Sequence, residues 1–178
     1  MKSKLWMNIV RVLILILVIG LSVYIFIVRD KLKDLGVYGY PGIFLVSLIS
    51  NANLFLPVPG LVIATTMGSV FNPILVALAA GAGAAIGELT GYMAGFSGQF
   101  VVEKSEIFRK TMVWMKKYGG VVVFVLAAIP NPLFDIAGIC AGVLKMPVYE
   151  FLLYNFAGKF LKMLVAAYAG YATGHILP

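Results

Sequence analysis

Charged residues are scarce in this chain. Asp, Glu, Lys and Arg make up 12% of the 178 residues, against about 25% in a typical soluble domain, and the mean hydropathy is +1.01. A single cysteine, Cys140, excludes an intrachain disulfide, and its apolar surroundings favour a small buried packing residue. No phosphate-binding loop, catalytic triad spacing or metal-ligand cluster is found, so the sequence indicates neither an enzyme nor a cofactor or metal site. The composition predicts an all-α polytopic membrane protein.

The longest stretch without a formal charge runs from Leu35 to Gly87. Its fifty-three residues would form a helix of roughly 80 Å, although a single span needs only about 20 residues. The tetrapeptide 57–60 (Pro57-Val58-Pro59-Gly60) interrupts it and cannot lie inside a regular helix. Broken backbone at membrane depth is tolerated only where protein or a water-filled cavity surrounds it. The pattern therefore predicts a re-entrant helical hairpin whose tip contains Pro57, Pro59 and Gly60.

A second break, Pro130-Asn131-Pro132, divides another apolar stretch. Its arms, 119–129 and 133–144, would be about 16 and 18 Å long as helices, too short for about 30 Å of hydrocarbon. This stretch predicts a second re-entrant hairpin.

The sequence divides into an N-terminal part, 1–34, with one transmembrane helix and a short charged loop, and a larger part, 35–178. The larger part is predicted to contain a re-entrant hairpin over 36–71, a span over 74–98, an amphipathic interfacial segment over 99–118, a second re-entrant hairpin over 119–145 and a final span over 148–173.

The two hairpins share a sequence pattern. Each has a Pro-x-Pro followed by a glycine (Gly68, Gly142) and, five residues later, a proline (Pro73, Pro147). This indicates an internal duplication. An N-terminus in the cytoplasm makes the two copies antiparallel, an inverted repeat of the kind used by transporters.

The distribution of basic residues supports that orientation, because Lys and Arg concentrate on the cytoplasmic side. Three fall outside: Arg29, Lys31 and Lys33. Nine fall inside: Lys2, Lys4, Arg11, Lys104, Arg109, Lys110, Lys116, Lys117 and Lys145.

Four ionisable residues fall within predicted membrane segments: Glu88, Asp135, Lys159 and Lys162. A charge at the centre of a spanning helix costs about 3 kcal/mol on insertion scales, so such residues face the bundle interior and pair. One interpretation is that the lysines attract a phosphate headgroup while a carboxylate handles a proton. The other, equally weighted, is a buried Glu88–Lys159 ion pair that only fixes packing.

Three asparagines lie near the two tips: Asn51, Asn53 and Asn131. Their amides could bind a headgroup or an ion, but we favour the interpretation that they satisfy backbone groups at the breaks.

Five motifs, in this order, resemble the DedA/VTT-domain superfamily, also called SNARE-associated Golgi proteins: Pro-Val-Pro-Gly (57–60), Gly-Ala-Ala-Ile-Gly-Glu-Leu-Thr-Gly-Tyr-Met-Ala-Gly (83–95), Lys-Tyr-Gly-Gly (117–120), Ile-Pro-Asn-Pro-Leu-Phe-Asp-Ile-Ala-Gly (129–138) and Gly-Val-Leu-Lys-Met-Pro (142–147). The resemblance covers about residues 36–174. It implies opposed re-entrant hairpins, translocation of phospholipid or polyprenyl phosphate, and in some members proton coupling.

Glu88 matches an acidic position of the family, and Asp135 resembles the Pro-Phe-Asp of the wider VTT group. The chain departs from DedA proteins where Leu61 replaces a glutamate and where Ala127 and Leu133 replace arginines. Lys159 and Lys162 are candidates to replace those arginines.

We therefore expect a lipid transporter or scramblase that moves a phospholipid or polyprenyl phosphate between leaflets. The alternatives are a proton- or ion-coupled carrier of a small solute and a non-transporting membrane scaffold. The expected partners are membrane lipids with anionic headgroups and not nucleic acid, and a homo-oligomer is left open. The expected location is the prokaryotic plasma membrane, with a cytoplasmic N-terminus.

Overall fold

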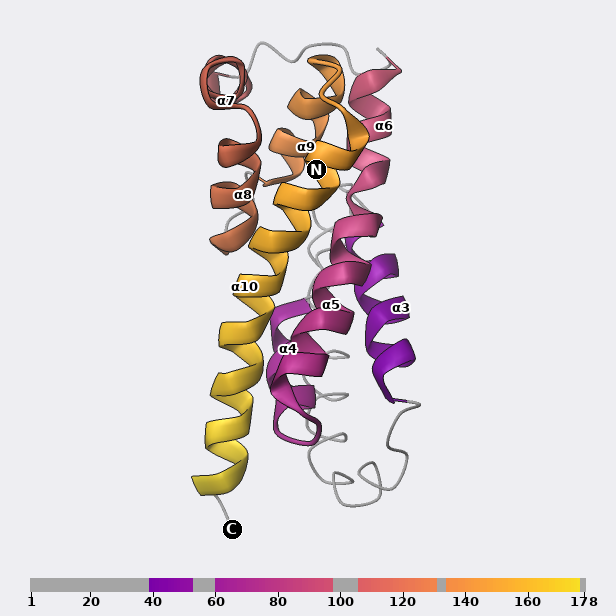
Figure 1. Ribbon diagram of the computed structural model, residues 1–178, viewed down its shortest axis with the longest axis vertical. Helices are drawn as coiled ribbons and strands as arrows, with labels where there is room; N and C mark the ends of the chain where they lie inside the picture. The colour runs from indigo at the N-terminus through magenta and orange to yellow at the C-terminus, as the bar shows by residue number, and fades with distance from the viewer. Residues whose placement is uncertain (1–38, 53–59, 98–105, 131–133, 177–178) are drawn as a thin grey trace, which may run out of the picture.

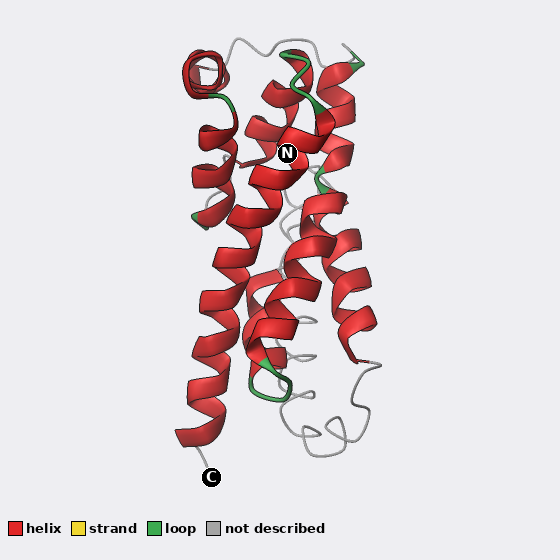
Figure 2. Cartoon of the chain, in the orientation of Figure 1, coloured by secondary structure: helices red, strands yellow, loops and turns green. Residues whose placement is uncertain are grey.

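Helices form almost all of the described backbone (Figures 1 and 2). The computed structural model describes residues 39–52, 60–97, 106–130 and 134–176. Its helices are α3 (Gly39–Ala52), α4 (Gly60–Gly68), α5 (Pro73–Gly87), α6 (Leu89–Phe96), α7 (Glu106–Tyr118), α8 (Gly120–Ala128), α9 (Phe134–Val143) and α10 (Val148–Ile176). The all-helical class is confirmed. The predicted N-terminal helix lies outside the described residues, as do Pro57 and Pro59 of the first tip and Asn131 and Pro132 of the second.

Two long helical units run nearly the full length of the molecule, α10 and the pair α5–α6 (Figure 1). Asn72 caps α5, because its side-chain oxygen accepts hydrogen bonds from the backbone N–H groups of Ile74 (3.0 Å) and Leu75 (3.4 Å). Pro73 follows at the first helical turn, where its missing N–H costs nothing. Among the described residues, Pro73–Phe96 is the one helix long and apolar enough to cross a membrane.

The span predicted over 74–98 corresponds to Pro73–Phe96, in which a turn at Glu88 separates α5 from α6. The interruption is slight, since the Glu88 N–H donates to the Ala84 carbonyl and the Tyr92 N–H to the Glu88 carbonyl, both at 3.2 Å. Glu88 keeps right-handed backbone angles (φ −66°, ψ −13°), so the axis continues through it. A glycine, Gly87, precedes this residue and favours the local loosening.

The four shorter helices α3, α4, α8 and α9 occupy opposite halves of the molecule. In Figure 1, α3 and α4 lie in the lower half, α8 and α9 lie in the upper half, and α7 lies across the upper end, where it is seen end-on. α3 packs along α5, and α8 packs along α10. In each of the pairs α3–α4 and α8–α9, the second helix packs on the other long unit. α4 packs on α10, and α9 packs on α6. The two halves therefore interlock.

Glycines make the two crossings close. At the α4–α10 crossing, a Cβ on Gly68 would meet the backbone of Ala167, and one on Gly170 would meet the carbonyl of Thr65. The α6–α9 crossing has the same arrangement, since Gly142 faces the carbonyl of Tyr92 and Gly95 faces that of Ile139. Small residues allow this backbone contact between membrane helices, where packing replaces the hydrophobic effect. The glycines of the predicted duplication thus make corresponding contacts.

A Schellman motif ends α9 and turns the chain into α10. The Met146 N–H donates to the Ala141 carbonyl (3.0 Å) and the Lys145 N–H to the Gly142 carbonyl (2.9 Å). Lys145 occupies the left-handed position with φ 54°, where glycine is usual. Pro147 then begins the approach to α10. The sequence Gly-Val-Leu-Lys-Met-Pro is therefore a helix-ending turn.

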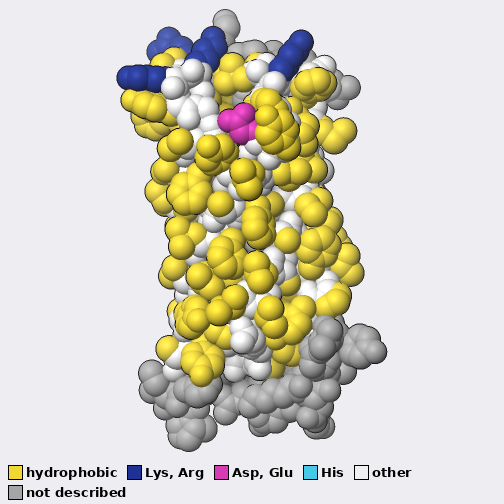
Figure 3. Space-filling model, viewed as in Figure 1, with side chains coloured by type: hydrophobic (Ala, Val, Ile, Leu, Met, Phe, Trp, Pro, Cys, Tyr) yellow, Lys and Arg dark blue, Asp and Glu magenta, His cyan; other side chains and the backbone are white. Residues whose placement is uncertain are grey.

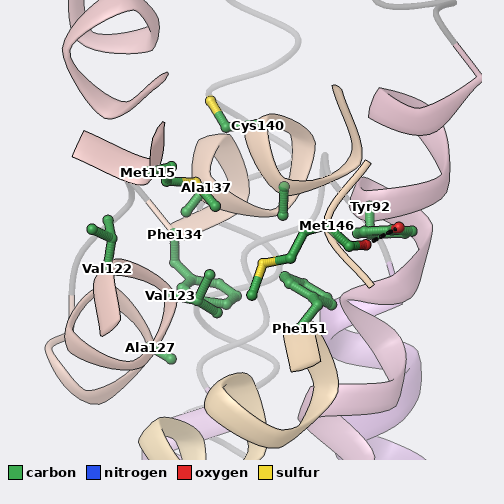
Figure 4. Packing of buried hydrophobic residues seen from close by; sticks show 11 residues of the cluster. Tyr92, Met115, Val122, Val123, Ala127, Phe134, Ala137, Cys140, Met146 and Phe151 are labelled. Atoms are coloured by element: carbon green, nitrogen blue, oxygen red, sulfur yellow. Dashed lines mark hydrogen bonds between the residues drawn. The ribbon is translucent and has the colours of Figure 1, made fainter. Parts of the chain in front are cut away.

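Two clusters of buried apolar side chains lie in the upper and lower halves. The upper one joins α6 to α10 through residues that include Tyr92, Phe134 and Phe151 (Figure 4). The Tyr92 hydroxyl donates to the Met146 carbonyl at 2.5 Å, which ties α6 to the α9–α10 turn. The free thiol Cys140 is buried in this cluster, as predicted.

Many large hydrophobic side chains are exposed on the described part of the surface. Hydrophobic side chains cover the middle of the face shown in Figure 3, and Lys and Arg side chains gather at its upper end. Large exposed side chains include Tyr149, Val165 and Leu153, each more than 60% exposed. An apolar belt with basic residues at its margin is what contact with lipid requires.

Candidate functional site: a buried ion pair beside a polar cavity

A buried ion pair joins the two long helical units. The Lys159 Nζ on α10 lies 2.6 Å from Glu88 Oε1, at the interruption between α5 and α6. Both residues are almost fully enclosed, at 3% and 4% exposure. The predicted ion pair between these two residues is therefore present. Each charge needs the other, because a buried charge without a partner is strongly destabilising.

Lys159 has two further partners. Its Nζ donates to Asn51 Oδ1 (2.8 Å) at the end of α3, and it lies 4.5 Å from the centroid of the Phe134 ring at the start of α9. An ammonium group has three N–H donors. Around Lys159 they meet the Glu88 carboxylate, the Asn51 amide oxygen and the face of the Phe134 ring. Lys159 therefore contacts α3, α9 and the turn between α5 and α6.

Asn51 is held for this contact by its own helix. Its Nδ2 donates to the Ser47 carbonyl (2.8 Å), which leaves Oδ1 directed to the lysine. We expected the amide to satisfy a free backbone group at the break, but it bonds a carbonyl within its own helix and accepts a hydrogen bond from the buried lysine. Asn53 and Asn131 lie outside the described residues.

A polar cavity of about 270 Å³ adjoins the pair. Its walls come from the ends of α3, α4, α8 and α9 and from the middle of the long helices. The lining residues are Asn51, Gly60, Leu61, Glu88, Pro130, Phe134, Asp135, Lys159, Lys162 and Met163. All four predicted membrane charges, together with the described tip residues Gly60 and Pro130, therefore surround one space.

The other two charges, Asp135 and Lys162, are more open than the pair. Asp135 is exposed on the first turn of α9, where the helix dipole favours a carboxylate, and Lys162 is half-buried on α10. Among the described residues, neither side chain forms a hydrogen bond or an ion pair. The site thus contains one buried ion pair and two further charges that line the same cavity.

Sequence reasoning missed a buried amide near this site. Asn155 is fully buried, and its Nδ2 donates to the Ala85 carbonyl at 3.3 Å, while its Oδ1 has no hydrogen-bond partner among the described groups. It precedes Lys159 by four residues and therefore lies on the same face of α10. That spacing could have identified it.

Nothing in the sequence identified Phe134 as a partner of Lys159. Among the described residues, no group of three His, Cys, Asp or Glu could hold a metal ion.

Comparison with known proteins supports a membrane protein. The profile of the VTT domain matches residues 58–172. The chain is 36% identical over 72 residues to the vacuole membrane protein KMS1 of Arabidopsis thaliana, and 49% identical over 37 residues to KMS2 of the same plant. These matches cover 40% and 21% of this chain, but only 17% and 9% of the plant proteins. An uncharacterized protein of Haemophilus influenzae is 26% identical over 135 residues, 70% of each chain. No solved structure matches.

The fold and site define a helical membrane protein with a buried polar centre. The domain match covers well over half of the chain, and the chain belongs to the VTT-domain family, which includes the DedA and SNARE-associated Golgi proteins. The resemblance stated from the sequence is confirmed.

Proposed function

We propose that this protein moves an anionic lipid, a phospholipid or a polyprenyl phosphate, between the two leaflets of a membrane. The observation that supports the proposal is the meeting of four ionisable side chains in one cavity, at mid-length of a molecule whose outer surface is apolar. A lipid that crosses a bilayer needs a polar site for its headgroup inside the membrane, while its acyl chains stay in the hydrocarbon. Buried charges of this kind mark substrate and ion pathways.

The proposal includes a membrane arrangement. α4 and α8 have nine residues each and α9 has ten, so none exceeds about 15 Å in length, half of a hydrocarbon core. We propose that α3–α4 and α8–α9 are re-entrant hairpins of an inverted repeat that enter from opposite sides. In the proposed orientation Lys116 and Lys117 at the end of α7, and Lys145 after α9, lie in the cytoplasm of a prokaryotic cell. Broken helices that meet near the midplane are a recurrent transporter design.

The proposed roles differ among the four charges. Lys159 is fully engaged by Glu88, Asn51 and the Phe134 ring, so it positions the tips. Lys162 opens on the same cavity without an ion-pair partner among the described groups, and it receives the phosphate. Asp135 lines the same cavity, and its carboxylate takes up or releases a proton.

The test is lipid exchange in liposomes that contain the purified protein and a labelled anionic lipid. Lys162→Gln keeps the length and polarity of the side chain but removes the charge, and it is expected to slow translocation several-fold. Lys116→Gln, an exposed lysine on α7, is the matched control and is expected to keep the wild-type rate. Wild-type rates for Lys162→Gln would contradict the proposed role. Unchanged translocation by Lys159→Ala would remove that lysine from the mechanism.

A coupled carrier of a small solute is the second candidate. The cavity volume, about 270 Å³, is close to the lower end of small-molecule sites, which begin at about 300 Å³. This function requires a cavity closed to lipid. Uptake of a solute by vesicles without lipid exchange would favour it. A scaffold without transport activity predicts that Glu88→Gln and Asp135→Asn both leave function intact.

A further inference from the structure

A second cavity lies away from the polar site, between α7 and α8. It has a volume of about 250 Å³, and the described residues that line it are all apolar or aromatic: Trp114, Tyr118, Val121, Val122, Val125 and Leu126. Four of them, Trp114, Tyr118, Val121 and Val125, are 43–55% exposed, so the cavity is an open groove on the surface. None of its lining residues belongs to the ion-pair site.

The position of α7 places this groove at the margin of the apolar belt. α7 lies across the end of the bundle (Figure 1), and its inner side, with Met115 buried, packs on the upper core. Its outer side keeps Trp114 and Tyr118 exposed, the two residue types enriched where membranes meet water. The groove therefore begins at the headgroup level and continues along α8 into the apolar belt.

The rim of the groove is basic. α7 carries four basic residues and one acid, and that acid, Glu106, is paired with Lys110 at 2.8 Å. The Lys117 Nζ lies 5.0 Å from the centroid of the Tyr118 ring, directly beside the groove. Lys116 is the adjacent residue, and the helical turn directs it to a different side of α7. Lys117 thus places a positive charge beside the Tyr118 ring, at the α7 end of the groove.

We propose that the α7–α8 groove binds one anionic phospholipid, with an acyl chain along Val121 and Val125 and the headgroup phosphate at Lys117. An acyl chain gains little free energy by moving from lipid to an equally apolar groove. The groove therefore fits the shape of the chain, and the charge of Lys117 selects an anionic headgroup. The binding is independent of translocation, and a lipid held here would anchor α7 to one leaflet. A partner protein in the groove would leave no lipid there.

The experiment uses the full-length protein in mixed micelles and measures two quantities. Native mass spectrometry gives the affinity for phosphatidylglycerol relative to phosphatidylcholine, and a phosphatidylglycerol with a photoreactive acyl chain maps the contact. In the wild-type protein, crosslinks are expected to concentrate in residues 114–126. Val125→Phe, which fills the groove, should remove most of them, whereas Val165→Phe, at an exposed site on α10, should not.

The charge is tested by two neighbouring lysines. Lys117→Gln is expected to lower the relative affinity for phosphatidylglycerol about fivefold, the factor for one basic residue at an anionic surface, and Lys116→Gln less than about twofold. Equal losses in the two variants would show a diffuse charge effect and overturn the proposal. Crosslinks spread evenly over the apolar surface would overturn it as well. Both variants replace exposed side chains, so neither outcome depends on the protein failing to fold.

Discussion

Glu88 and Lys159 lie 71 residues apart in the sequence, and their charged atoms are 2.6 Å apart in the interior. One belongs to the interruption of α5–α6 and the other to the middle of α10. The pair therefore joins the long helices of the two halves of the chain. Because Lys159 also contacts Asn51 and Phe134, the pair fixes an end of α3 and of α9 against them.

Breaking this pair is expected to be strongly destabilising. Lys159→Met leaves Glu88 buried without a cation, at a cost of about 3–5 kcal/mol in the free energy of unfolding. Thermal unfolding of the purified protein in detergent measures the loss. The double variant Glu88→Leu, Lys159→Met should recover most of it, since a matched apolar pair leaves no charge behind. A double variant no more stable than Lys159→Met would show that the ion pair is not the source of the loss.

The sequence predicted much of this centre, because charges in apolar segments and prolines in pairs are strong local signals. Glu88, Asp135, Lys159 and Lys162 were identified from their positions within predicted membrane segments, and they line one cavity. The crossing of α4 to α10 and of α9 to α6 was not predicted. Apolar periodicity shows which residues face inward, but it does not show which helix receives them when the surrounding lipid is equally apolar.

The fine structure at Glu88 was also beyond the sequence. The apolar pattern continues through residues 73–96 and does not mark the turn at Glu88 that separates α5 from α6. Asn155 was missed for a related reason, since an asparagine in a helix is usually interpreted as a polar surface residue. Its burial depends on the packing of α10 against α5.

Alanine at the glycine crossings is expected to destabilise the protein. Gly170→Ala places a methyl group against the Thr65 carbonyl, and Gly142→Ala places one against the Tyr92 carbonyl. Each should cost about 1–3 kcal/mol, as for other overpacked sites. The free energy of unfolding in detergent is the measurement. Similar losses are expected for the two variants, because the two crossings have corresponding contacts.

The control for this series is Gly42→Ala on α3. This glycine is exposed and a Cβ there meets nothing within 4 Å, so the variant should be as stable as the wild type or slightly more stable. A loss at Gly42 equal to that at Gly170 would indicate that the glycines act through flexibility and not through close contact.

Replacement of Asn155 by leucine is expected to be nearly neutral. The substitution gives up one long hydrogen bond, 3.3 Å to the Ala85 carbonyl, but it also removes a buried oxygen without a partner among the described groups. An unsatisfied buried polar group costs about 1–3 kcal/mol, and a single hydrogen bond contributes about 1 kcal/mol, so the two effects offset each other. Unfolding of Asn155→Leu beside the wild type checks this. A loss above about 3 kcal/mol, the upper end of that range, would mean that the amide oxygen is bound in the folded state.

The turn between α9 and α10 offers a stabilising substitution. Lys145 holds a left-handed conformation (φ 54°) that costs a residue with a side chain about 1–2 kcal/mol and costs glycine little. Both hydrogen bonds of the Schellman motif come from backbone groups, so Lys145→Gly preserves them. We expect Lys145→Gly to raise the free energy of unfolding by about 1 kcal/mol, less than the full strain because glycine also gains freedom in the unfolded chain. Lys145→Ala is the matched control, since it removes the same charge but keeps the Cβ, and it should give no gain. If both variants were stabilised equally, the gain would come from removing the positive charge, and the left-handed backbone would not be the cause.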